Sequence, residues 1–172
     1  MSDRGRKLLD AASGQISALE ELFTARDDAV LRRMCPGREG LGDGSVAACA
    51  FHTADNYHRI AAFIRGRPAS AHAPGYRADG ADAARLVQRL STARRELSVL
   101  ADLSDEALDE VPVDSDMRFC DGRRTLEEVV RNLLKHQSHS VDALRGAVEL
   151  DPEAWPVAGG LLDEQPAPPP AG

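Results

Sequence analysis

Apolar side chains recur every three or four residues in four stretches of this 172-residue chain, at about residues 4–34, 45–65, 80–101 and 125–150. Residues at this spacing share one face of an α-helix, whereas strands bury every second residue. Each stretch therefore predicts an amphipathic helix that must bury one face. Aromatic residues make up only 4% of the chain, so aliphatic side chains must fill most of the core, which also favours helices.

Capping signals mark the ends of the predicted helices. Ser45 is a favourable N-cap for the second helix, and a glycine and a proline follow its last turn. Thr125 and Glu128 have the spacing of a capping box at the start of the fourth helix. Residues 36–44 are rich in glycine and predict a loop, and residues 104–108 predict a short helical turn.

The order of these segments predicts an all-α four-helix bundle. A long connection, at about residues 67–80, separates the second helix from the third and serves as a crossover. We assign residues 1–150 to the bundle domain. Residues 151–172 are rich in proline and predict a mobile tail.

Composition excludes several classes of partner. The formal net charge of −7 provides no basic field for nucleic acid, and no run of about 18 apolar residues predicts a membrane span. The three cysteines lack the spacing of a metal knuckle, so we expect free thiols in a reducing cytoplasm. The sequence barely constrains oligomeric state and leaves a homodimer open.

Three histidines carry most of the chemical information. The chain has no Gly-rich phosphate loop, CxxC, HExxH or nucleophile elbow. His52 lies in the second predicted helix, and His136 and His139 lie in the fourth. Neutral imidazoles that converge on one point predict a site for a divalent metal, Zn²⁺ or else Ni²⁺ or Fe²⁺, with open coordination positions. We expect His52 and His136 to be the catalytic residues.

The helical period also predicts which polar residues face inward. His136 lies on the flank of the apolar face of the fourth helix, and His139 is turned further away. Inward polar groups need hydrogen-bond partners, which a pocket between the second and fourth helices would supply. Five residues are expected to line this pocket and bind a small-molecule substrate: Cys49, Thr53, Asn56, Gln137 and Ser140.

Other polar residues receive simpler interpretations. Asp55 and Arg59 flank His52 at helical spacing, and a surface ion pair between them is favoured over a role in the site. His58 and His72 are expected on the surface. The segment that contains Arg118, Cys120 and Asp121 is expected either to rim the site or to form a simple turn.

Two motifs resemble those of the DinB-like (YfiT) superfamily of bacterial four-helix proteins. A histidine follows a Pro-Gly loop in PGREGLGDGSVAACAFH, and another lies near the middle of the fourth helix in LLKHQSHSVDAL. The resemblance covers about residues 5–150. The family commonly places a second histidine four residues after His136, where this chain has Ser140; here the next histidine, His139, comes after three.

The resemblance implies an up-down-down-up bundle and a metal held by His52, His136 and His139. The superfamily includes thiol-dependent S-transferases and mycothiol-dependent maleylpyruvate isomerases. Transfer of a low-molecular-weight thiol such as mycothiol is therefore the first reaction expected, and hydrolysis of an activated ring is the second. In both, the metal would lower the pKa of a bound thiol or water for attack on an electrophilic carbon.

Two metal-free alternatives stay open. In the first, the pocket binds or sequesters a hydrophobic small molecule without transforming it. In the second, His52 or His136 acts as a general base in a metal-free enzyme.

Overall fold

The computed structural model describes residues 2–24, 26–67 and 76–149, and this part of the chain contains helices and no strand, which confirms the all-α prediction. Four long helices are joined by one short α-helix and two 3₁₀ helices. In chain order the elements are α1 (Asp3–Thr24), η1 (Asp28–Arg32), α2 (Val46–Ile64), α3 (Ala83–Leu97), η2 (Ser98–Asp102), α4 (Asp105–Asp109) and α5 (Leu126–Glu149).

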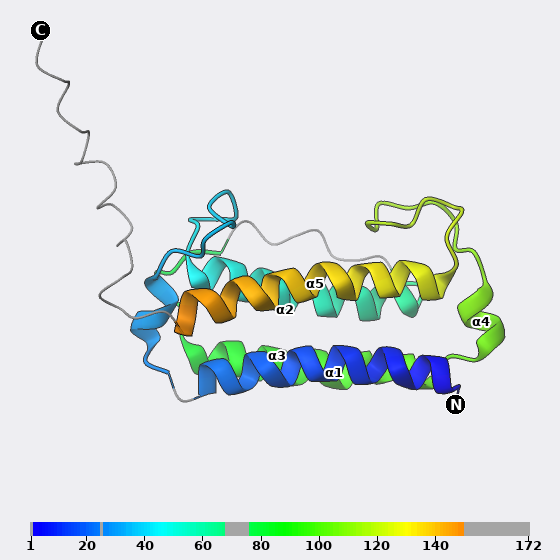
Figure 1. The fold of residues 1–172 in the computed structure, drawn as a ribbon, viewed down its shortest axis with the longest axis horizontal. Coiled ribbons are helices and arrows are strands. Elements are labelled where there is room, and N and C mark those ends of the chain that lie inside the picture. Colours follow the sequence, from blue (N-terminus) through cyan, green and yellow to red (C-terminus); the bar gives the residue numbers. More distant parts are fainter. Residues whose placement is uncertain (1, 25, 68–75, 150–172) are drawn as a thin grey trace, which may run out of the picture.

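The long helices run in two directions, with α1 and α5 parallel to each other and antiparallel to α2 and α3 (Figure 1). Contacts along α1 show this order. Arg4 forms an ion pair with Glu127 near the start of α5. Further along both helices, Gln15 Nε2 donates to the Leu134 carbonyl at 2.9 Å. The helices α2 and α5 also pack against each other, and they carry the predicted site residues.

The core is aliphatic except for a few rings, of which Tyr57 is the most informative. Its side chain is fully buried, and its hydroxyl donates to Gln15 Oε1 at 2.7 Å. Burial raises the pKa of Tyr57 because the phenolate would lose its hydration. The hydroxyl therefore stays protonated and joins α2 to α1.

The predicted caps are present. The Ser45 side chain accepts from the Ala48 amide at 3.1 Å. In the capping box, Thr125 Oγ1 accepts from the Glu128 amide at 3.2 Å and Glu128 Oε2 accepts from the Thr125 amide at 2.8 Å. The short turn predicted after Ser104 is α4.

The first helix is shorter than predicted. It ends at Thr24, and residues 28–32 form the separate 3₁₀ helix η1. The cause is local, because the Asp27 side chain accepts from the Ala29 amide at 3.0 Å and caps a new helix instead of continuing α1. None of the described helices combines the length and apolarity needed to cross a bilayer. The predicted tail, residues 151–172, lies outside the described residues. The division into a bundle domain and a tail therefore stays a prediction.

Two glycines of α1 provide a matched test of this packing. A Cβ atom at Gly5 would collide with the Leu100 carbonyl oxygen of η2, whereas a Cβ atom at Gly14 would meet nothing within 4 Å. We expect Gly5→Ala to lower the free energy of unfolding by about 1–3 kcal/mol, the usual cost of overpacking. Gly14→Ala should raise it by roughly 0.5–1 kcal/mol through helix propensity. Urea denaturation measures both, and equal effects would contradict the close approach of η2 to α1.

Candidate functional site

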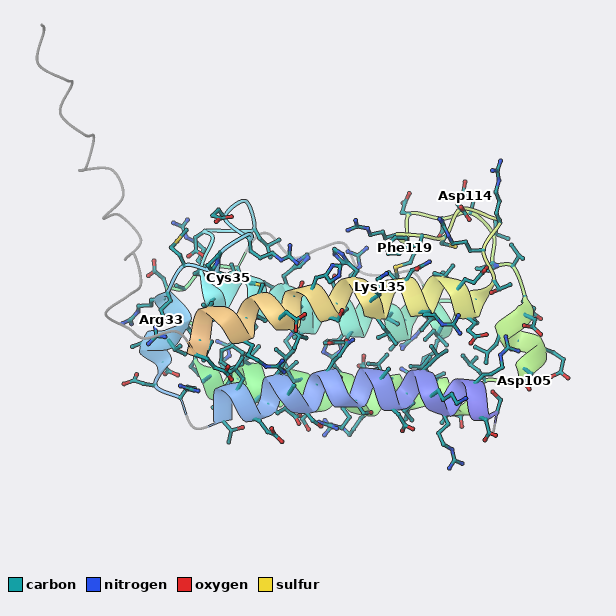
Figure 2. All side chains as sticks on the ribbon, in the orientation of Figure 1. Arg33, Cys35, Asp105, Asp114, Phe119 and Lys135 are labelled. Atoms are coloured by element: carbon teal, nitrogen blue, oxygen red, sulfur yellow. The ribbon has the colours of Figure 1, made fainter. Side chains whose placement is uncertain are left out.

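A pocket of about 170 Å³ lies between α2 and α5. A loop that precedes α5 covers it, and Figure 2 labels Asp114 and Phe119 on this loop. The two helices and the loop contribute its lining: His52, Asn56, Arg59, Ile60, Leu133, His136 and Gln137 from α2 and α5, and Asp116, Met117 and Arg118 from the loop.

His52 and His136 line this same pocket from facing helices. Both side chains are half-buried. The two histidines therefore border one cavity, although 84 residues separate them in the chain.

Arg118 lies directly against the imidazole of His136, with 3.1 Å between Arg118 Nη1 and His136 Nε2. A guanidinium only donates hydrogen bonds, so Nε2 must be the unprotonated, accepting nitrogen of a neutral ring. Burial lowers the pKa of His136, and the nearby charges of Arg118, Arg38 and His139 lower it further. His136 therefore presents a lone pair at neutral pH.

A buried amide joins the two helices beneath the pocket. Gln137 is 1% exposed, and its Nε2 donates to the Thr53 carbonyl at 2.8 Å while its Oε1 accepts from Asn56 Nδ2 at 3.2 Å. Thr53 Oγ1 in turn donates to the Cys49 carbonyl at 2.7 Å. The inward orientation predicted for Thr53, Asn56 and Gln137 is correct. Of these three, Asn56 and Gln137 reach the pocket lining.

Cys49 and Ser140 lie further along the seam between α2 and α5 and do not line the pocket. Arg38 Nη2 donates to Ser140 Oγ at 3.3 Å. Cys49 is fully buried beside Cys35. The hydrogen bond from the Cys35 thiol lowers the pKa of Cys49, and the positive charge of Arg38 acts in the same direction. These residues form a polar cluster outside the pocket lining.

His139 is exposed and does not line the pocket. Three residues turn an α-helix by about 300°, which is about 60° short of a full turn. His139 therefore points in a different direction from His136. Across residues 2–24, 26–67 and 76–149, no group of three His, Cys, Asp or Glu side chains is arranged to hold a metal ion. Since a guanidinium also contacts the Nε2 atom that a metal would take, the arrangement does not fit a three-histidine centre, and metal binding stays a prediction.

Two predictions about α2 are wrong. Asp55 is not a surface residue; it is 9% exposed and accepts from Arg89 Nε of α3 at 2.6 Å. His58 is not a solvated histidine, because its Nδ1 lies 2.7 Å from Glu96 Oε2 of α3 and its Nε2 is buried. Both residues face α3, a neighbour that the period of α2 alone does not identify. His72 lies outside the described residues.

The loop before α5 combines the two interpretations that the sequence left open. Arg118 rims the pocket, together with Asp116 and Met117, which sequence analysis missed. Asp121 has the turn role, because it accepts from the amides of Arg123 and Arg124 at 3.0 and 3.1 Å. Cys120 is buried and its thiol donates to the Val113 carbonyl at 3.2 Å, which holds the loop together. The Arg-Phe-Cys-Asp-Gly run was the only signal for this rim.

Residues 11–140 match the sequence profile of the DinB superfamily, a match that covers most of the chain. No curated protein and no solved structure shows significant similarity to it.

The buried amide should matter for stability. We expect Gln137→Ala to lower the free energy of unfolding by about 2 kcal/mol, because it leaves the buried Thr53 carbonyl and the half-buried Asn56 side-chain amide without this partner. Gln88→Ala, on the exposed face of α3, is the matched control and should change stability by less than about 0.5 kcal/mol. Comparable losses in the two variants in urea melts would show that the amide does not join the helices.

The pKa of His136 should lie below about 6.5, the value of an unperturbed histidine. NMR titration of the imidazole signals measures it, and Arg118→Ala should raise it by removing a neighbouring positive charge. In the unmodified protein, the lowered pKa means that His136 binds a proton less readily in the native state than in the unfolded chain. The free energy of unfolding should therefore fall as pH drops from about 6.5 to the His136 pKa. His136→Asn should remove this part of the pH dependence; an unchanged profile would contradict the assignment.

Proposed function

Because the chain belongs to the DinB superfamily, we propose that it is a small-molecule enzyme whose α2–α5 pocket activates a thiol or water by general-base catalysis. The observation that carries this proposal is the contact between Arg118 Nη1 and His136 Nε2 inside a pocket that His52 also lines. It combines a neutral base with a cation that can bind an anionic substrate.

The general base in this proposal is His136. Its Nε2 lone pair is directed at the Arg118 guanidinium, and its lowered pKa keeps the ring neutral near pH 7. A positioned imidazole in this state can take a proton from a thiol or a water molecule as that group attacks. His52, on the facing helix, supplies a second imidazole within the same small volume.

Arg118 suits the recognition of a carboxylate. Its present hydrogen bond is to a neutral nitrogen, whereas a guanidinium binds a carboxylate through shorter and stronger charge-assisted bonds, often two in parallel. A substrate carboxylate would therefore displace Nε2 from Arg118. This exchange frees the base at the moment when the substrate enters.

The proposed reaction is the addition of a thiol to an electrophilic carbon conjugated to a carboxylate. His136 takes the S–H proton as the new C–S bond forms, and the electron pair of the attacked double bond moves toward the carboxylate held by Arg118. The imidazolium of His136 then returns its proton to the substrate or to the departing thiolate. Water can replace the thiol, and the same step is then the hydration of the double bond.

Kinetics with mycothiol and maleylpyruvate, the pair that the family resemblance suggests, test this proposal. We expect His136→Gln to lower kcat/KM by about 10²-fold or more, the contribution typical of a general base. His139→Gln, three residues away and exposed, should have no effect. Arg118→Gln should raise KM by about tenfold, the loss expected for one charge-assisted hydrogen bond, while Arg123→Gln on the same loop should not.

Equal rates for the His136 and His139 variants would contradict the general-base role. Calorimetry tests the alternative in which the pocket binds a small molecule without transforming it. Stoichiometric binding of maleylpyruvate, with no consumption when mycothiol is present, would support that alternative and contradict the enzyme proposal.

A metal-dependent route through the same pocket is the second candidate, because His52 and His136 line it together. The general-base route predicts activity that survives chelator treatment of protein purified without a His-tag. Elemental analysis decides the alternative. Stoichiometric zinc, nickel or iron that is lost, together with activity, on chelation and in His52→Ala would establish the metal route.

A further inference from the structure

A second pocket, of about 400 Å³, opens on the opposite side of α2, where this helix packs against α3. Two aromatic rings, two guanidinium groups and an imidazole line it, and none of these side chains lines the α2–α5 pocket. The lining residues that the argument uses are Phe51, His58, Tyr76, Arg85 and Arg89.

The aromatic wall of this second pocket is held in place before any ligand binds. The rings of Phe51 and Tyr76 stack with 5.1 Å between centroids and 26° between planes. Asp55, which is 9% exposed, accepts from the Tyr76 hydroxyl at 2.6 Å and from Arg89 Nε at 2.6 Å. One buried carboxylate therefore positions both a ring and a guanidinium, and such preorganisation lowers the entropic cost of binding.

One cation of the second pocket is not matched by a carboxylate. Asp55 matches the charge of Arg89, and Glu96 lies against His58 Nδ1 at 2.7 Å. Arg85 is exposed and forms no ion pair with any described residue. His58 Nε2 is buried and has no hydrogen-bond partner among the described residues, which is rare for a native polar atom. Because His58 Nε2 is closed to solvent, the group that the pocket offers to an anion is the guanidinium of Arg85.

We propose that this second pocket binds an aromatic carboxylate. The ring of the ligand would lie against the half-buried Tyr76, and its carboxylate would pair with Arg85 beside Arg89. This binding site is separate from the α2–α5 pocket and does not depend on the function proposed for it.

Titration of the full-length protein with 4-hydroxybenzoate, followed by ¹H–¹⁵N NMR, tests the site. We expect saturable shifts of amides in α2 and α3 around residues 51–58 and 85–92, with a Kd on the order of 1 mM or below. Arg85→Gln should weaken binding by about tenfold, as expected for the loss of a charge-assisted hydrogen bond. Because Arg85 is exposed, this variant should fold normally.

Two control variants and one control ligand make the result decisive. Arg145→Gln, on the exposed face of α5, and Arg118→Gln, in the other pocket, should leave the Kd unchanged. Cyclohexanecarboxylate should bind at least about tenfold more weakly than 4-hydroxybenzoate if stacking on the ring contributes. Absence of saturable shifts, equal binding of the two ligands, or a loss of binding in Arg118→Gln but not in Arg85→Gln would each overturn the proposal.

Discussion

The buried amide of Gln137 is the interaction on which the candidate site depends. Its Nε2 donates to the Thr53 carbonyl of α2, and its Oε1 accepts from the side-chain amide of Asn56 on the same helix. These two bonds fix both the rotation and the axial position of α5 against α2. Burying an amide without partners costs several kcal/mol, so the two helices have one strongly preferred alignment here. His136 is the residue next to Gln137 in the chain, and this alignment therefore decides where its imidazole lies. The position of the pocket therefore depends on the hydrogen bonds that Gln137 makes between α5 and α2.

Much of this arrangement follows from local sequence. The Ser45 N-cap and the capping box of Thr125 and Glu128 depend only on residues within one turn, and both form as their spacing predicts. The inward direction of Thr53, Asn56 and Gln137 follows equally well, because the helical period relates each residue to the apolar face of its own helix. The same reasoning separates His136, which reaches the pocket, from the exposed His139.

Contacts between different elements could not be predicted in this way. The helical period of α2 does not show that α3 covers the side of Asp55 and His58 and supplies Arg89 and Glu96. The loop that carries Arg118 has no period at all, so its position over His136 depends on tertiary packing. The predicted end of α1 was wrong for another reason. Apolar spacing continues beyond Thr24, but the side chain of Asp27 accepts from the backbone and starts a new helix.

The position of α2 between two pockets has a thermodynamic consequence. Its residues alternate between the side that faces α5, with His52 and Asn56, and the side that faces α3, with Phe51 and His58. A helix moves largely as a rigid body, so any occupant of one cavity that displaces α2 also changes the walls of the other. Two ligands of this chain would then obey linkage: whatever factor the first applies to the affinity of the second, the second must apply to the first.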